Sequence, residues 1–360
     1  MILTTIRSVV LIIIYILIEP EILIQSQQVP CIFFYGDSQF NNGNNNVLIT
    51  LAKSNYPPYG VDYPDGPTGR FSNGQNIADF IAQLLGFANS ISPFVSTRGS
   101  DILRGVNYAS GSAGILDETG ALVGDRITMS MQLLNHRITI SRIAHLLGNN
   151  QTAVNIYLNK CLYVVNMGSN DYLNNYYVTL LPTRQLYTPE QFAEILIKKL
   201  TQQLKTLYSF GARKVAVFGL GLLGCVPQEL ANFPTNRSGG CVDFINYAVQ
   251  SFNNRLAPLV DNLNTDLPDA HFTLINITNI SLGDPSLLGV RVTNAPCCQV
   301  RRSTGLCTPN QVPCSNRSDY MFWDNFHPTE IANRATASRS YNAMLPTDAY
   351  PVDIRSLVQQ

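Results

Sequence analysis

Five short apolar runs alternate with segments of helical periodicity along the chain, and this alternation limits the possible folds more than any other feature of the sequence. A short apolar run between turn-forming residues is typical of a strand that is buried on both faces. Strands that alternate with helices are joined by right-handed crossovers into a parallel sheet. We therefore expect a single α/β domain built on a parallel sheet.

The positions of the expected elements follow from these patterns. The strands are predicted at residues 31–35, 105–109, 161–167, 214–218 and 271–276, and the helices at residues 77–85, 129–147, 190–207, 244–263 and 329–344. Residues 55–74, rich in Pro, Gly and Tyr, and residues 295–318, rich in Cys, Pro and Arg, predict two long loops. Long loops in a compact domain are often functional, and we expect disulfides to hold the second one.

The amino-terminal segment has the pattern of a secretory signal peptide. Arg7 precedes ten apolar residues, Val9 to Ile18, and two glutamates and a proline end the run. Such a run is too short to span a bilayer. We expect residues 1–26 to be a signal peptide and residues 27–360 to form the mature domain. A buried amino-terminal helix is the alternative.

Cysteine usage and glycosylation sequons favour export. All eight cysteines lie beyond the predicted cleavage position, and an even number suits an oxidising compartment. No C-x-x-C pair with a matching pair of histidines occurs, so we expect no zinc site. Five sequons are compatible with glycosylation in the secretory route. They begin at Asn150, Asn236, Asn276, Asn279 and Asn316.

The charge composition argues against polyanionic partners. Lys plus Arg number 24, Asp plus Glu number 24, and only 13% of the residues are charged. Such a chain lacks the basic surface that binds nucleic acid or an anionic membrane. We expect no nucleic-acid partner and no stable membrane span, and the sequence does not predict the oligomeric state.

The first predicted strand runs into the stretch CIFFYGDSQFNNGNNN, which places Ser38 just beyond its carboxyl end. Open α/β sheets bind their ligands at that edge. Ser38 is therefore a candidate nucleophile, provided that a base takes its proton. A turn serine that caps the next helix is the alternative. We expect the asparagines that follow to fix this loop by hydrogen bonds to its backbone.

A base for this serine must be one of four histidines. His136 and His145 fall in a predicted amphipathic helix, where they are expected to be solvated or packed, and His271 opens a predicted strand. His327 differs, because Asp324 precedes it by three residues in FWDNFHPTE. A carboxylate at this spacing can bind Nδ1 of the imidazole and leave Nε2 free as the base. The alternative is an Asp-His pair that only caps a helix.

Two more stretches offer hydrogen-bond donors for a developing oxyanion. In VNYASGSAGIL a strand is followed by Gly111, where the absence of a side chain lets the backbone N–H approach a ligand. In VVNMGSNDYLNNY another strand is followed by Asn170, whose side-chain N–H could reach the same crevice. Taken alone, Gly111 could equally be an ordinary turn glycine, and Asn170 would be interpreted as a turn asparagine.

A competing pattern occurs in KVAVFGLGLLGC, where Gly219, Gly221 and Gly224 form the G-x-G-x-x-G of dinucleotide-binding sites. Two prolines and a Gly-Gly pair follow, in place of the helix whose amino terminus would bind a pyrophosphate. We therefore expect no nucleotide cofactor. A loop closed by a disulfide between Cys225 and Cys241 is the favoured interpretation.

Taken together, four separate blocks resemble the plant-type GDSL esterases/lipases of the SGNH hydrolase superfamily. The blocks are FYGDSQFNNGNNN, GVNYASGSAGI, VVNMGSNDYLNNY and FWDNFHPTEIANR. The resemblance covers about residues 29–344. It implies a three-layer α/β/α sandwich with a five-stranded parallel sheet in the flavodoxin-like order 2-1-3-4-5. In that order Cys31 and Cys161 would begin neighbouring strands, so the resemblance also predicts a disulfide between them.

The same resemblance implies roles for five residues. Ser38 would be the nucleophile, His327 the general base and acid, and Asp324 the carboxylate that orients His327. The backbone N–H groups of Ser38 and Gly111 and the side chain of Asn170 would form the oxyanion hole. No metal or nucleotide cofactor is implied.

The implied activity is that of a secreted serine esterase or lipase of the apoplast or cell wall, which hydrolyses lipid or small-molecule esters through an acyl-enzyme. The family usually has Leu at the position of Gln39, Asp at that of Asn41, and Pro-Ile at Leu222 and Leu223. None of these departures removes a catalytic group. Two alternatives follow: an extracellular acyltransferase acting on a polymer hydroxyl, and a wall or defence binding protein with a weakened site.

Overall fold

The computed structural model describes residues 26–233 and 240–360. The predicted signal peptide, except its last residue, and the sequon at Asn236 lie outside the described residues. Within them, the main sheet has the strand order β2-β1-β3-β4-β5-β8. Its strands are β1 (Ile32–Gly36), β2 (Gly105–Asn107), β3 (Leu162–Asn166), β4 (Lys214–Phe218), β5 (His271–Ile275) and β8 (Ala349–Tyr350).

The predicted parallel sheet is confirmed. Strand β1 pairs in parallel with β2 and β3, and β3–β4 and β4–β5 continue the parallel sheet. The order 2-1-3-4-5 is therefore present. The sheet also has a sixth strand, β8, which pairs antiparallel with β5. It was not predicted, because two residues are too short for any periodicity to show.

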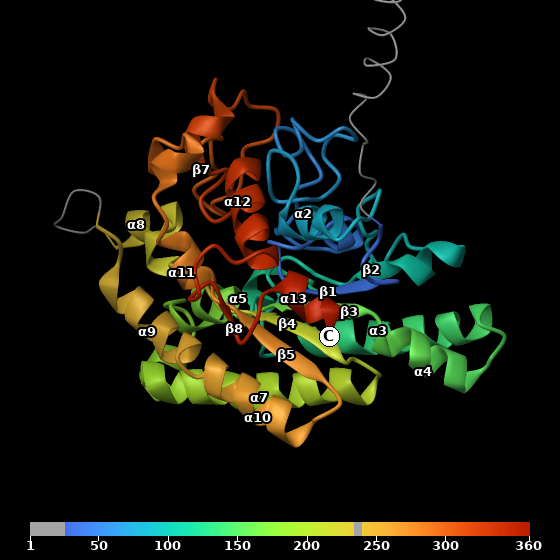
Figure 1. Ribbon diagram of the computed structural model, residues 1–360. Helices are drawn as coiled ribbons and strands as arrows, with labels where there is room; N and C mark the ends of the chain where they lie inside the picture. Colours follow the sequence, from blue (N-terminus) through green and yellow to red (C-terminus); the bar gives the residue numbers. More distant parts are fainter. Residues whose placement is uncertain (1–25, 234–239) are drawn as a thin grey trace, which may run out of the picture.

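Helices cover both faces of the sheet, which gives the predicted three layers (Figure 1). Alternate strand residues such as Phe33 and Tyr163 pack with one set of helices, and Phe34 and Val164 pack with the other set. The first set is α3 (Met129–Leu146), α4 (Gln151–Asn159), α7 (Pro189–Ser209), α9 (Asp243–Asn253) and α10 (Leu256–Asp266). The second set is α2 (Ile77–Leu84), α12 (Glu330–Tyr341) and α13 (Ile354–Gln359).

Helix positions agree with the prediction except in two respects. The single helix predicted at 244–263 is two helices, because Pro258 cannot donate a backbone hydrogen bond and its ring excludes a continuous helix through the preceding turn. Short helices that were not predicted are α4, α5 (Ser169–Asp171), α6 (Thr183–Leu186), α8 (Pro227–Asn232), α11 (Ile277–Ser281) and α13. Helix α8 lies directly after the glycine pattern, where the two prolines were expected to prevent a helix.

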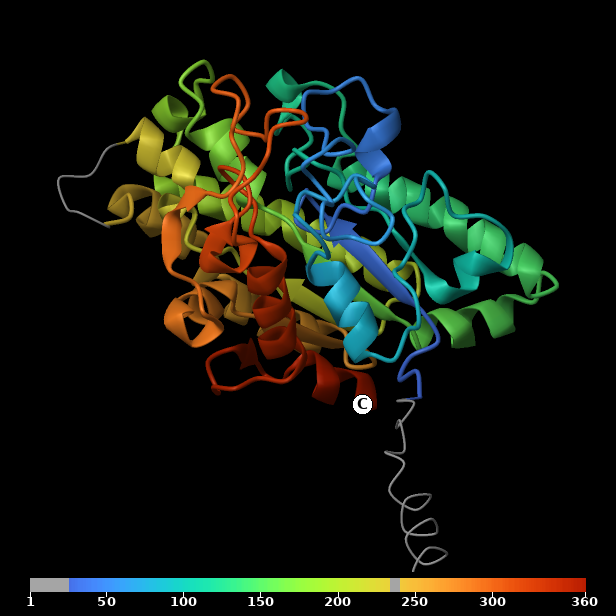
Figure 2. The same cartoon turned by 90° about the horizontal axis from the view of Figure 1, so that it is seen from above.

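The two long loops lie side by side at one edge of the molecule (Figure 2). The Asn310 N–H donates to the Pro57 carbonyl over 2.8 Å, which joins them directly. A small parallel pair, β6 (Val292–Pro296) and β7 (Tyr320–Phe322), flanks the second loop. This region has its own hydrophobic cluster around Tyr59 and Trp323.

All eight cysteines form disulfides, and none is free. The predicted pairs Cys31–Cys161 and Cys225–Cys241 are confirmed. The remaining pairs, Cys297–Cys314 and Cys298–Cys307, both close the second long loop, as expected for that segment. In the part of the chain that the structure describes, no helix is long and apolar enough to cross a membrane.

Candidate active site

The structure brings Ser38, His327 and Asp324 together, although 289 positions separate the serine from the histidine. Ser38 follows β1 by two residues, and the other two lie between β7 and α12. His327 Nε2 is 2.7 Å from Ser38 Oγ, and His327 Nδ1 is 2.8 Å from each carboxylate oxygen of Asp324. With Nδ1–H facing the carboxylate, Nε2 presents its lone pair to the serine hydroxyl.

Asp324 and His327 form a tight turn that fixes the carboxylate. The backbone N–H groups of Phe326 and His327 both donate to Asp324 Oδ1 over 2.8 Å. Aspartate commonly binds backbone donors two and three residues ahead in this way. Asp324 is fully buried, and only 6% of the surface of His327 is exposed. The pair is thus shielded from water, which strengthens its electrostatic interaction.

Aromatic and acidic groups surround the histidine. The ring of Phe71, from the first long loop, lies against His327 with a centroid separation of 4.7 Å. Asp37 precedes the serine, is buried, and accepts a hydrogen bond from the Gln39 N–H over 3.0 Å. Burial raises the pKa of Asp37 to about 6. The sequence analysis assigned no role to either residue: Asp37 lies in the FYGDSQFNNGNNN block beside Ser38, and Phe71 lies in the first long loop.

Gly111 and Asn170 lie in the same region but differ in what their N–H groups bind. The Gly111 N–H donates to Asn45 Oδ1 over 2.9 Å, so it is not free in this conformation. Asn170 Nδ2 donates one hydrogen to the Ala113 carbonyl over 2.9 Å. An amide nitrogen carries two hydrogens, so a second one is left for a ligand. Among the described residues, no protein acceptor binds the Ser38 N–H.

A neighbouring carboxylate fixes the turn that carries Asn170. Asp171 is fully buried and accepts hydrogen bonds from the N–H groups of Ile115 and Leu116 over 2.7 and 3.0 Å. These contacts tie the turn after β3 to the loop after β2. Burial raises the pKa of Asp171 to about 7.

The asparagines after Ser38 bind backbone groups, as predicted. Asn44 Nδ2 donates to the carbonyls of Asn107 and Ala109, and Asn45 Nδ2 donates to the Ala52 carbonyl, over 2.9 to 3.0 Å. Asn41 Oδ1 accepts the N–H groups of residues 43 and 44. The Asn that replaces the family's usual Asp at position 41 therefore still performs a loop-fixing role.

Gln39, another of the departures, has a partner and does not displace the serine. Its Oε1 accepts a long hydrogen bond of 3.5 Å from Asn166 Nδ2, at the end of β3. The 2.7 Å contact between Ser38 and His327 is present beside it.

The other histidines lie away from this cluster. His136 is fully buried, contacts the Tyr108 hydroxyl over 3.1 Å, and has its pKa lowered to about 3 by burial. His145 and His271 are exposed. Among residues 26–233 and 240–360, no three His, Cys, Asp or Glu side chains are grouped so that they could hold a metal ion.

The glycine pattern after β4 belongs to the disulfide-closed loop. Asn246 Oδ1 accepts the Gly224 N–H over 2.8 Å, and a Cβ at Gly224 would meet the Val242 carbonyl oxygen at 2.3 Å. The glycine is thus required by contact between two parts of the same loop, which favours a structural role for the pattern.

Comparisons with known proteins give a consistent family. The family model for GDSL-like lipase/acylhydrolase matches residues 32–340. Three proteins of Arabidopsis thaliana, each described as a GDSL esterase/lipase, are 51, 50 and 48% identical to the chain. These matches cover 91 to 92% of this chain and 92% of each relative. The match to a crystal structure of a Bacillus subtilis protein covers 86% of this chain and 54% of that protein's chain, with 12% identity and a TM-score of 0.34.

Proposed function

The chain belongs to the GDSL-like lipase/acylhydrolase family and is a carboxylic ester hydrolase, and from that premise we propose that it is a secreted serine esterase that forms an acyl-enzyme on Ser38. The proposed substrates are esters of lipids or small molecules. The observation that carries the proposal is the 2.7 Å contact between Ser38 Oγ and His327 Nε2, with Asp324 on the other imidazole nitrogen.

In the proposed mechanism, His327 Nε2 takes the Ser38 proton as Oγ attacks the ester carbonyl. The carbonyl oxygen becomes an oxyanion, which the Ser38 N–H and the second amide hydrogen of Asn170 would stabilise. His327 then gives the proton to the departing alcohol. In the second half, it activates a water molecule that hydrolyses the acyl-enzyme. Asp324 keeps the required tautomer and balances the charge of the imidazolium.

The role proposed for Gly111 is different from the one implied by the family resemblance. Because its N–H is bound by Asn45, we infer that Gly111 acts by letting the chain approach this loop closely. A Cβ at Gly111 would meet Asn45 Nδ2 at 2.9 Å and the Phe71 ring at 3.1 Å. The proposed oxyanion hole therefore consists of two donors in this conformation.

Secretion is supported by the pairing of all eight cysteines, since disulfides persist in oxidising compartments. The predicted signal peptide and the sequons at Asn150, Asn276, Asn279 and Asn316 agree with that location. We therefore propose that the mature enzyme acts outside the cell, in the apoplast or cell wall.

The proposal is tested by labelling the purified protein with a fluorescent phosphonate, with Ser38→Ala as the matched control. Labelling of the wild type alone, together with hydrolysis of nitrophenyl esters from acetyl to palmitoyl, is the expected result. A folded wild type that neither reacts nor hydrolyses any ester would overturn it and favour a binding protein. The reaction is also run with an added alcohol. If the main product is then the ester of that alcohol and not the free acid, an acyltransferase is favoured.

A further inference from the structure

Tyr59 contacts the proposed triad from the first long loop. Its hydroxyl lies 2.6 Å from Asp324 Oδ2, and the residue is fully buried. The His327 imidazole is 2.8 Å from both oxygens of this carboxylate. Oδ1 also accepts two backbone N–H groups, whereas among the described residues Oδ2 accepts none and has the Tyr59 hydroxyl in their place. A carboxylate that is bonded at one oxygen can still rotate. The Tyr59 hydroxyl is the group that fixes the second oxygen.

The direction of this hydrogen bond follows from the surroundings of Tyr59. Burial, and next the charge of Asp324, raise the pKa of Tyr59 well above its ordinary value of 10, so the phenol keeps its proton. The phenol oxygen accepts the Cys307 N–H over 3.1 Å. With its oxygen bound by that donor, the Tyr59 O–H is directed at Asp324. Donation to an ionised carboxylate makes this hydrogen bond a strong one.

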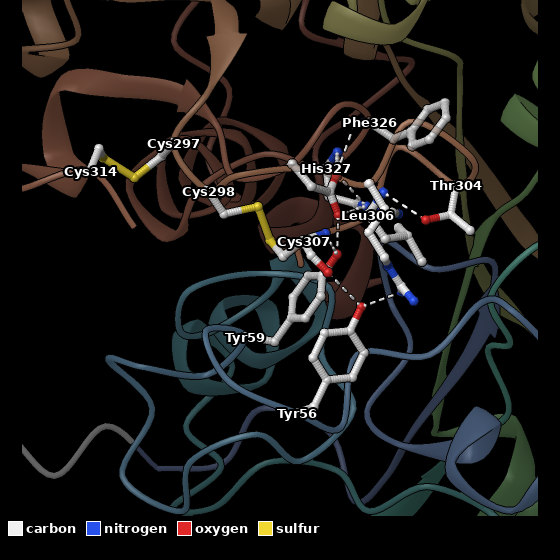
Figure 3. Close-up of a disulfide and its surroundings, with 12 residues drawn as sticks. Tyr56, Tyr59, Cys297, Cys298, Thr304, Leu306, Cys307, Cys314, Phe326 and His327 are labelled. Atoms are coloured by element: carbon white, nitrogen blue, oxygen red, sulfur yellow. Dashed lines mark hydrogen bonds and ion pairs between the residues drawn. A yellow bond between two sulfur atoms is a disulfide. The ribbon is translucent and has the colours of Figure 1, made fainter. Parts of the chain in front are cut away.

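The second long loop holds the other side of Tyr59. Cys307 is joined to Cys298 by a disulfide, and the Cys298 N–H donates to the Trp323 carbonyl, next to Asp324, over 3.0 Å. Tyr56 donates its hydroxyl to the Cys307 carbonyl over 2.9 Å. Figure 3 shows Tyr56 and Tyr59 next to each other, with their hydroxyl groups close to Cys307. Both main-chain polar groups of Cys307 are thus bound by tyrosines.

We propose that Tyr59 is a positioning residue for Asp324, and that the Cys298–Cys307 loop holds Tyr59 in that place. This inference rests on the proposed function and extends it, because it makes the orientation of the triad depend on both long loops. The same loop as Tyr59 also supplies Phe71, whose ring lies against His327. Both members of the proposed Asp-His pair are therefore supported by residues 55–74.

The test compares Tyr59→Phe with Tyr56→Phe. Tyr59→Phe keeps the ring contacts with Tyr56 and Phe71, at centroid separations of 5.3 and 6.0 Å, and removes only the hydroxyl. We expect kcat to fall about tenfold while KM changes less than about twofold, because the loss affects the proton transfer and not substrate binding. Tyr56→Phe also loosens Cys307 but does not touch Asp324, so its kcat should stay within about twofold of the wild type. Melting temperatures of both variants exclude a folding defect.

A double-mutant cycle tests the part played by the disulfide. Replacing Cys298 and Cys307 by Ala should lower kcat about as much as Tyr59→Phe, and combining the changes should add little, since both act through one hydrogen bond. Additive losses would overturn the link between the loop and Tyr59. Wild-type kcat in Tyr59→Phe, or equal losses in both tyrosine variants, would overturn the positioning role. Phosphonate labelling of the wild type is run alongside, so that a failure of the proposed function is recognised separately.

Discussion

Glu229 is a buried carboxyl group that lies outside the candidate site. Only 3% of its surface is exposed, and Oε2 has no hydrogen-bond partner in the described part of the chain. Burial raises its pKa from 4.5 to about 7. An unpaired carboxylate in such a place is costly, so the folded protein holds a proton there at pH values where the unfolded chain has lost it.

Glu229→Gln should therefore stabilise the protein at high pH. The folded-state pKa is raised, so the stability due to the protonated group is complete below about pH 4.5 and is lost as the pH rises through about 7. The variant lacks this loss. The unfolding free energy of the variant minus that of the wild type, measured by urea denaturation, should rise by roughly 3 kcal/mol between pH 4.5 and pH 8. A difference that is constant across this range would contradict the raised pKa.

The residues of the candidate triad were predictable, because each lies next to the end of an apolar run or within a compact Asp-x-x-His turn. Tyr59 and Asn45 were not predictable as site residues. Tyr59 binds Asp324, which is 265 positions away in the sequence, and Asn45 binds Gly111, which is 66 positions away. Such pairings depend on how two loops pack, which local sequence patterns do not specify. The occupied N–H of Gly111 could not be foreseen for the same reason.

At the scale of secondary-structure elements, the pairing of β1 with β2 depends on one glycine. Gly105 begins β2 opposite Ile32, with φ of 113°, and a Cβ there would meet the Ile32 carbonyl oxygen at 1.9 Å. Gly105→Ala should lower the unfolding free energy by about 3 kcal/mol or more, since neither the backbone angle nor the contact tolerates a side chain. Denaturant titration measures the loss.

Gly99 provides the matched control. It also has a positive φ, of 54°, but nothing lies within 4 Å of the position that a Cβ would take there. Gly99→Ala should cost only about 1 kcal/mol, the backbone part of the penalty. Equal losses for the two variants would show that contact with β1 contributes nothing.

The disulfides should differ in their effect on stability. Cys31–Cys161 joins the starts of β1 and β3 across a separation of 130 residues, whereas Cys298–Cys307 spans 9. Closing the longer loop restricts the unfolded chain more. Replacing both cysteines by Ala should cost about 5 kcal/mol for the first pair and about 3 kcal/mol for the second. Guanidinium unfolding checks the ranking, which fails if opening the short loop costs more.

Elements with a strong periodic signal were predicted closely, and the errors have physical causes. Strand β4 agrees to the residue, because its five residues are enclosed between two helical layers. The break between α9 and α10 was missed because the apolar periodicity continues across it, through Leu256 and Leu259. Strand β8 and helix α13 were missed because their sequences are too short to show a period. Their position depends on the rest of the fold.

At the scale of the whole molecule, the candidate site joins the two ends of the domain. Ser38 comes from the first strand, and Asp324 and His327 come from the segment before α12. Helices α2 and α12 lie together over the same face of the sheet (Figures 1 and 2) and share one hydrophobic cluster. Helix α13 belongs to that cluster as well. The geometry of the site thus depends on packing by the carboxyl-terminal end of the chain.

A chain that ends at Pro346 should be strongly destabilised. It lacks Ile354, Leu357 and Val358, which are buried against the sheet, and burial of each such side chain contributes about 1.5–3 kcal/mol. It also lacks Asp348, a fully buried carboxylate that forms an ion pair with Arg339. We expect a loss of at least about 5 kcal/mol, comparable with the whole stability of many domains.

The matched control for this truncation ends at Val358 and removes only two exposed glutamines. Its unfolding free energy should stay within about 0.5 kcal/mol of the full chain, as for most surface changes. Urea unfolding and ester hydrolysis are measured together, because loss of the shared cluster should reduce both. If the chain ending at Pro346 unfolds at the same urea concentration as the full chain, α13 does not support the core. In that case, the packing of α2 against α12 does not need α13.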